Sequence, residues 1–128
     1  MTPFGRKVRE LRAARGVTMK EMAEALRVTP AYLSALEHGK RGRPSWRIVQ
    51  EIIGFFNVIW DEAEELERLA RLSHPRIVID TGGMSPQATE AANLLAERIN
   101  DLSQTKLEKL IDLLAPEKKN SGARKADK

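Results

Sequence analysis

The chain has 128 residues and no cysteine, so its length suits one domain with or without an appendage, and disulfides and thiolate metal sites are excluded. The formal net charge of +4 hides a segregation of charge along the chain. Residues 1–50 carry eleven Lys and Arg against four Asp and Glu, residues 51–115 carry six against twelve, and the tail from Pro116 carries five against two. A basic block beside an acidic one indicates that one end meets a polyanion, although an unevenly charged surface is a simpler explanation.

Several classes of protein are disfavoured by what the sequence lacks. No apolar run approaches the roughly 20 residues needed to span a bilayer, and the N-terminal MTPFGRKVRE lacks the apolar stretch of a signal peptide. We therefore expect a cytoplasmic protein. His38 and His74 lie far apart without partners of the kind that bind metals, and there is no nucleophile–base pattern or phosphate-binding glycine loop. We expect neither a cofactor nor an enzyme.

The first helix is predicted over residues 4–15. Phe4, Val8 and Leu11 recur at the spacing of one face of an amphipathic helix, and Gly16 follows its end.

Two short helices follow, each with a recognisable start. Thr18 caps the second helix, and Glu21 three residues later completes a capping box. Thr29 caps the third helix with Pro30 at its first position, where a missing N–H costs nothing, and Gly39 ends it.

Four more elements complete the helical prediction. Ser45 opens a fourth helix, and Asp61 opens a fifth whose first turn is acidic, as the helix dipole favours. Ser85 and Ser103 cap two final helices with apolar faces. The tail from Pro116 is basic and has no apolar periodicity, so we expect it to be disordered.

The second and third helices and the basic loop after them predict a helix-turn-helix. Only Arg27 and Val28 separate the two helices, and Ala23 is small where they must cross. Leu33 and Leu36 hold the third helix down on one side. The residues left facing outward are Pro30, Ala31, Tyr32, Ser34, Ala35 and His38.

The sequence here resembles the Xre/Cro/cI family of helix-turn-helix regulators. The matching residues are TMKEMAEALRVTPAYLSALEHGKR at 18–41 and RPS at 43–45, and the resemblance extends over residues 4–72. It implies a mainly α protein whose residues 1–73 form a five-helix, λ-repressor-like DNA-binding domain. Members of this family bind duplex DNA as dimers, mostly as transcriptional repressors.

The resemblance also implies roles for individual residues. It places the third helix, the recognition helix, in the major groove, and places Thr18 and Met19 near a phosphate. The family often has Gln where Met19 stands, so a contact there would depend on backbone amides. The family often has Gly where Arg27 stands, so we expect either a positive φ or a slightly different turn. Arg12 and Glu37 match positions that form a structural ion pair in some members.

The chemistry of the recognition helix is unusual for a base-reading helix. Positions 30–35 hold no Arg, Asn or Gln, the side chains that make bidentate contacts to guanine or adenine edges. The methyl groups of Ala31 and Ala35 and the ring of Tyr32 suit the thymine methyl, and the Ser34 hydroxyl is permissive. We expect sparse, thymine-weighted readout, with much of the specificity coming from DNA shape.

Three cations follow the recognition helix in a segment that we call the basic loop, residues 40–43. Lys40, Arg41 and Arg43 are expected to neutralise phosphates and release counterions, although a solvated loop is the simpler explanation. Arg43 entering the minor groove is one alternative. Another is that His38, Arg41 or Arg43 supplies the base contact that the helix lacks.

Residues 74–115 are predicted to form a dimerisation module. RIVID at 76–80 is β-branched and short, which predicts a strand. One strand cannot satisfy its own backbone, so we expect it to pair with the same strand of a second copy. The alternative is an extension that folds back on the fifth helix. The residues expected at the dimer contact are Ile77, Val78, Ile79, Leu95, Ile99, Leu110 and Leu114.

The function predicted from the sequence is a sequence-specific, double-stranded DNA-binding regulator, most simply a dimeric repressor. The alternative is an antitoxin that neutralises a protein toxin and regulates its own operon. The short, poorly hydrophobic tail argues against that alternative. The sequence leaves the operator and any small-molecule inducer unknown.

Overall fold

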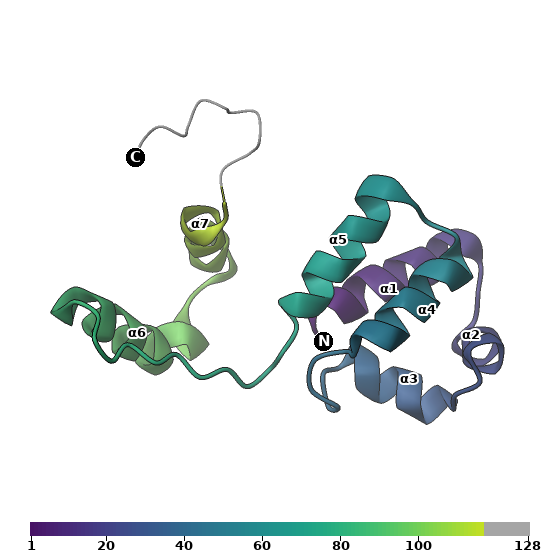
Figure 1. Ribbon diagram of the computed structural model, residues 1–128, viewed down its shortest axis with the longest axis horizontal. Coiled ribbons are helices and arrows are strands. Elements are labelled where there is room, and N and C mark those ends of the chain that lie inside the picture. Colours follow the sequence, from purple (N-terminus) through teal and green to yellow (C-terminus); the bar gives the residue numbers. More distant parts are fainter. Residues whose placement is uncertain (117–128) are drawn as a thin grey trace. The chain divides into compact units, whose positions relative to one another are not determined.

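The computed structural model describes residues 1–116, which form seven α-helices and one 3-10 turn (Figure 1). The chain divides into two units, Met1–Val78 and the residues from Ile79 on. The first unit therefore extends beyond the predicted domain boundary at residue 73. The predicted disordered tail lies outside the described residues, apart from Pro116.

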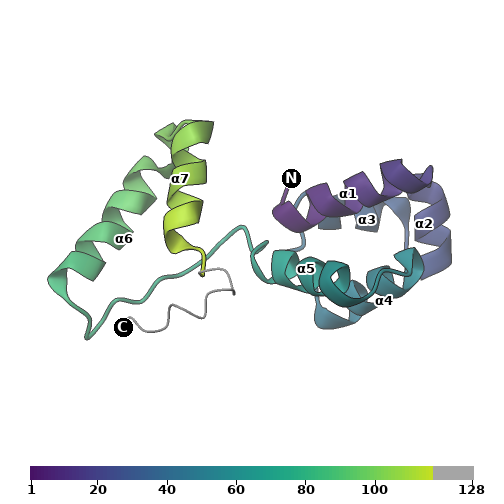
Figure 2. The ribbon, with the colours of Figure 1, turned by 90° about the horizontal axis from the view of Figure 1, so that it is seen from above.

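The first unit consists of five helices, and Figure 2 shows α2 at its edge. Helix α1 packs against α3 and α5, α4 packs against α5, and α2 packs against α3 and α4. The bounds of the helices are Pro3–Arg15 for α1, Met19–Leu26 for α2, Pro30–Glu37 for α3, Trp46–Phe56 for α4 and Trp60–Arg71 for α5.

Most of the predicted helix starts are confirmed. The side-chain oxygens of Thr18, Thr29 and Ser45 each accept a hydrogen bond from the backbone three residues on, which satisfies a free helical N–H. Helix α5 differs, because it begins at Trp60 without a side-chain cap. Asp61 therefore lies inside the first turn, where its charge faces the positive end of the helix dipole.

The turn of the helix-turn-helix is left-handed at its first residue. Arg27 has φ of 61° and ψ of 42°, which is the positive φ that the sequence left open. The N–H of Val28 donates to the carbonyl of Ala23 at 3.0 Å, so the turn closes directly onto α2. An arginine can occupy this conformation at a modest steric cost.

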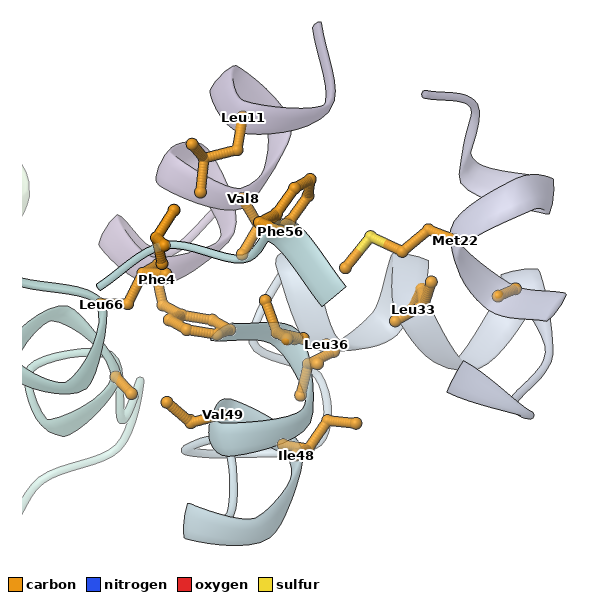
Figure 3. Close-up of a cluster of buried hydrophobic side chains, with 14 residues drawn as sticks. Phe4, Val8, Leu11, Met22, Leu33, Leu36, Ile48, Val49, Phe56 and Leu66 are labelled. Atoms are coloured by element: carbon orange, nitrogen blue, oxygen red, sulfur yellow. The ribbon is translucent and has the colours of Figure 1, made fainter. Parts of the chain in front are cut away.

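A single apolar core, built from all five helices and the α4–α5 connection, holds the first unit together (Figure 3). Burying a valine, leucine, isoleucine, phenylalanine or methionine side chain contributes about 1.5–3 kcal/mol to folding. The buried apolar residues are Phe4, Val8, Leu11, Met22, Ala23, Leu33, Leu36, Ile48, Val49, Ile52, Phe56, Val58, Leu66 and Ala70.

Three distant segments meet beside this core. The N–H of Thr2 donates to the carbonyl of Glu37 at 3.1 Å, at the end of α3. The N–H of Phe4 donates to the buried hydroxyl of Ser73 at 2.9 Å, just after α5. Gly5 lies directly against the backbone of Glu37, where a Cβ would come within 2.0 Å of its carbonyl oxygen. The start of α1 is thereby joined to the ends of α3 and α5.

The described part of the second unit, residues 79–116, is helical but has no core of its own. Helix α6 spans Pro86–Arg98, the 3-10 turn η1 spans Ile99–Asp101 and α7 spans Gln104–Leu114. Ser85 and Ser103 cap α6 and α7 as predicted. No residue of these elements is buried in the single chain.

The predicted strand at 76–80 is wrong for the single chain. These residues form no strand, and Ile77, Val78 and Ile79 are exposed. A β-branched run becomes a strand only where a second backbone pairs with it, and residues 1–116 contain no strand that could do so.

The contact between α1 and α3 gives a stability prediction. Gly5→Ala places a methyl group against the Glu37 backbone, so the helices must separate. We expect a loss of about 1–3 kcal/mol or more in the free energy of unfolding, measured by urea denaturation. The control is Gly54→Ala on the exposed side of α4, where a Cβ meets nothing within 4 Å. This control should gain about 0.5–1 kcal/mol, and equal effects of the two substitutions would contradict the prediction.

Candidate nucleic-acid interface

Helix α3 is fixed on one side and open on the other. The Thr29 hydroxyl accepts from the N–H of Tyr32 at 3.0 Å, which sets the start of the helix. Leu33 and Leu36 are buried, with 1% and 3% of their surface exposed. The opposite side of α3 is consequently available to a partner.

The residues expected on that open side divide into two groups. Pro30, Ala31, Ser34 and His38 are exposed, whereas Tyr32 and Ala35 are half-buried. Tyr32 packs against the edge of the core.

His38 is turned back onto its own helix. Its Nδ1 atom lies 3.0 Å from the carbonyl oxygen of Ser34, a contact in which the ring N–H donates. This contact occupies Nδ1 and leaves Nε2 as the outward polar atom.

The start of α2 presents less to a phosphate than expected. The N–H of Thr18 donates to the Glu21 carboxylate at 2.9 Å, and the Thr18 hydroxyl accepts from the N–H of Glu21 at 3.0 Å. The capping box therefore places a negative charge at this helix end. Met19 is half-buried against the core, so Thr18 is the more exposed of the two.

The basic loop folds tightly against the end of α3. The N–H of Lys40 donates to the carbonyl of Ala35 at 2.9 Å, and the N–H of Gly42 donates to the carbonyl of Gly39 at 3.1 Å. Gly39 and Gly42 adopt positive φ of 78° and 76°, which glycine tolerates without steric cost. The loop presents three exposed cations, Lys40, Arg41 and Arg43.

One of these cations lies over an aromatic ring of α3. Arg41 Cζ is 4.8 Å from the centroid of the Tyr32 ring, within the range of a cation–π interaction. Sequence reasoning placed both residues near DNA but missed their contact. The residues are nine apart with a turn between them, and the only local signal was the pair of glycines that lets the loop fold back.

A buried ion pair orients α3 on α1. Arg12 Nη2 lies 2.9 Å from Glu37 Oε2, and the two side chains are 13% and 3% exposed. Arg9 Nη2 approaches Glu37 Oε1 at a looser 3.8 Å. Since Glu37 is the last residue of α3, the pair fixes the helix end from which the basic loop departs.

The open side of α3 and the basic loop lie next to each other. Neutral side chains of α3 lie beside the cations of the basic loop, an arrangement that suits a groove flanked by phosphates. Residues 1–116 contain no cluster of three potential metal ligands. In the same stretch, no helix combines the length and apolarity that crossing a bilayer requires.

Comparison with known proteins identifies the same domain. Residues 3–69 match the family described as "Helix-turn-helix domain". The chain is 34% identical over 61 residues to the "Uncharacterized HTH-type transcriptional regulator RghRB" of Bacillus subtilis (strain 168). The alignment covers 48% of this chain and 44% of that relative, so the chain spans less than half of the relative's length. No solved structure matches the chain significantly.

The Arg12–Glu37 pair gives a second stability prediction. Arg12→Met leaves the Glu37 carboxylate buried without its close partner, and we expect a loss of roughly 3–5 kcal/mol in the free energy of unfolding. The double variant Arg12→Met, Glu37→Met removes both charges and should recover part of that loss.

The matched control for this pair is Arg47→Met, which breaks the exposed Arg47–Glu51 pair. It should change stability by no more than about 0.5 kcal/mol. Chemical denaturation measures all three variants. A double variant less stable than Arg12→Met would show that the carboxylate is not stranded by loss of the arginine.

Proposed function

Because the chain belongs to the helix-turn-helix family of DNA-binding transcriptional regulators, we propose that it is a sequence-specific repressor that binds duplex DNA as a homodimer. In this proposal α3 enters the major groove of each half-site. The family is one of regulators rather than enzymes, and such a protein works in the cytoplasm, where bacterial or phage DNA lies.

The observation that carries the proposal is the pairing of an uncharged open face on α3 with three exposed cations beside it. A neutral helix gains little Coulomb attraction from DNA. Lys40, Arg41 and Arg43 supply that attraction by neutralising phosphates and releasing condensed counterions. Phosphate contacts fix the register of the protein, and the helix face is then left to meet base edges.

The open face favours contacts to thymine over contacts to guanine or adenine. Ala31 and Ser34 are exposed and small, and Ala35 is half-buried, so the groove floor meets methyl groups and a hydroxyl. None of these side chains makes a bidentate hydrogen-bond pair. Sequence-dependent groove width and stiffness would then contribute much of the remaining specificity.

The second unit supports the dimer part of the proposal. Very small units that cannot build a sufficient core usually need disulfides, a metal or oligomerisation to be stable. The chain has no cysteine, and residues 1–116 hold no metal-ligand cluster. Leu95 of α6 and Leu107 and Leu110 of α7 are only half-buried, and Ile99 and Leu114 are exposed. A second copy would bury these faces and would supply the second α3 that a two-half-site operator requires.

In the antitoxin alternative, the apolar faces of α6 and α7 bind a protein toxin instead of a second copy of this chain. A full-length protein that is monomeric alone, and that co-purifies with a small second protein, would favour that alternative over the homodimer.

The proposal predicts how binding depends on salt. Each neutralised phosphate contributes about 0.9 to the slope of log affinity against log salt concentration. Lys40→Gln and Arg43→Gln should each lower that slope by about 1, and the double variant by about 2. Fluorescence anisotropy with a labelled duplex at several salt concentrations measures it.

The control for the salt series is Arg68→Gln. Arg68 lies on α5 and bonds to Glu65, and its removal should leave the slope unchanged. Failure of the wild-type chain to bind any duplex at low ionic strength would refute the proposed function.

The dimer gives a separate prediction. Leu110→Asp places a charge on the apolar face of α7, and we expect light scattering to show half the mass of the wild-type protein. Thr105→Asp adds the same charge on the opposite side of α7 and should leave the mass unchanged. A chain ended after Val78 keeps the whole core of the first unit and should be monomeric. A shortened chain as dimeric as the full one would exclude the second unit as the dimer contact.

A further inference from the structure

The recognition helix lacks a side chain that makes a bidentate contact to a base, whereas the basic loop holds two arginines that could supply one. Arginine is the commonest partner of guanine, because its guanidinium donates two parallel hydrogen bonds to O6 and N7. An arginine on a loop normally loses much conformational freedom when it makes such a contact. A base contact from the loop is therefore favoured if the protein holds the side chain in place beforehand.

Arg41 is held in this way, and its neighbours are not. Its guanidinium carbon lies 4.8 Å from the centre of the Tyr32 ring. Within residues 1–116, the only other arginine over a ring is Arg15, which lies over Phe56 and also donates to that residue's carbonyl. Arg41 is thus the one member of the basic loop whose guanidinium lies over an aromatic ring of the recognition helix.

The ring beneath Arg41 is itself held by the fold. Tyr32 is half-buried against the edge of the core. It lines a surface hollow together with Val28 from the α2–α3 turn and Ser45 and Ile48 from the start of α4. The packing of Tyr32 against the core holds one side of the ring, and the other side faces this open hollow.

The loop backbone carries Arg41 back toward this ring. The hydrogen bond from Lys40 N–H to the Ala35 carbonyl caps the end of α3, and the bond from Gly42 N–H to the Gly39 carbonyl closes the loop. Both turns are already formed in the protein without DNA.

We propose that Tyr32 is a positioning residue that holds Arg41 for a guanine contact, so that Arg41 supplies the bidentate base contact that α3 lacks. Stacking uses only the flat face of the guanidinium and leaves its N–H donors free in the plane of the group. Those donors can then form the bidentate pair with a guanine edge. The inference rests on the proposed function, and it adds to that function one residue pair and one base.

The ring and the hydroxyl of Tyr32 make different predictions. If the ring positions Arg41, Tyr32→Phe keeps the contact and Tyr32→Leu loses it. If the hydroxyl itself touches a base, both substitutions lose the contact.

The experiment selects preferred duplexes from a pool with a randomised central segment, using the full-length chain and its variants. The wild-type and Tyr32→Phe proteins should enrich a motif with a G·C pair at one fixed position of each half-site. Tyr32→Leu and Arg41→Lys should lose the preference at that position alone, and bind the wild-type motif about tenfold or more weakly. Arg68→Lys on α5, outside the basic loop, is the control, and it should keep the preference.

The salt dependence of binding and the thermal stability of the variants separate a loss of base readout from a loss of charge or of folding. Tyr32→Leu retains the charge of Arg41, so its salt slope should equal that of the wild type, whereas a purely electrostatic role predicts no loss of base preference at all. Arg41→Lys alters only an exposed side chain, so it tests the inference even if Tyr32→Leu proves less stable by thermal unfolding.

The outcomes separate this inference from the function beneath it. A wild-type motif that Tyr32→Leu and Arg41→Lys both reproduce in full would overturn the inference and leave the DNA-binding function intact. Loss of the G·C preference in Tyr32→Phe would also overturn it. Enrichment of no motif by the wild-type protein would refute sequence-specific binding itself.

Discussion

The end of α3 is fixed by contacts that converge on one residue, Glu37. Its carboxylate is buried against Arg12, and its carbonyl accepts from the N–H of Thr2 while its backbone lies against Gly5. Side chain and main chain of the same residue are therefore both held by α1. Glu37 therefore sets the position of both parts of the candidate interface. The basic loop follows this end of α3, and the open side of α3 precedes it. A buried charge pair contributes little net stability, but it makes one arrangement of the two helices strongly preferred over arrangements that would separate the charges.

The sequence predicted the parts of this arrangement that depend on near neighbours. The caps at Thr18 and Thr29 involve residues within one turn, so their spacing could be recognised directly. The contact between Phe4 and Ser73 joins residues 69 apart and left no local signal. The stacking of Arg41 on Tyr32 depends on how a loop folds back, which side-chain spacing does not reveal. The strand predicted at 76–80 is not formed in the single chain for a related reason, since β-branched composition is a local preference and a strand requires a partner.

The second unit illustrates the difference between forming helices and forming a fold. Ser85 and Ser103 cap α6 and α7 as well as any residue of the first unit, yet neither helix buries a side chain. Short helices gain most of their stability from packing an apolar face rather than from propensity or caps. Exposed Leu114 and Ile111 at the end of α7 are costly in water for the same reason. The segment from α6 to α7 is consequently the part of the described chain whose stability depends most on what covers it.

The connection between the units begins at a fixed point of the first one. The buried hydroxyl of Ser73 accepts from Phe4 and donates to the carbonyl of Leu69, so the chain is still held two residues after α5 ends. The ring of Pro75 lies close enough to Gly39 that a Cβ there would meet it at 3.6 Å. The connection thus leaves the first unit beside the end of α3, close to the residue that α1 holds. Residues 73–75 are thus fixed to the first unit. In a dimer of the kind proposed, the distance between the two recognition helices would then depend on the exposed residues after Pro75 and on the dimer contact.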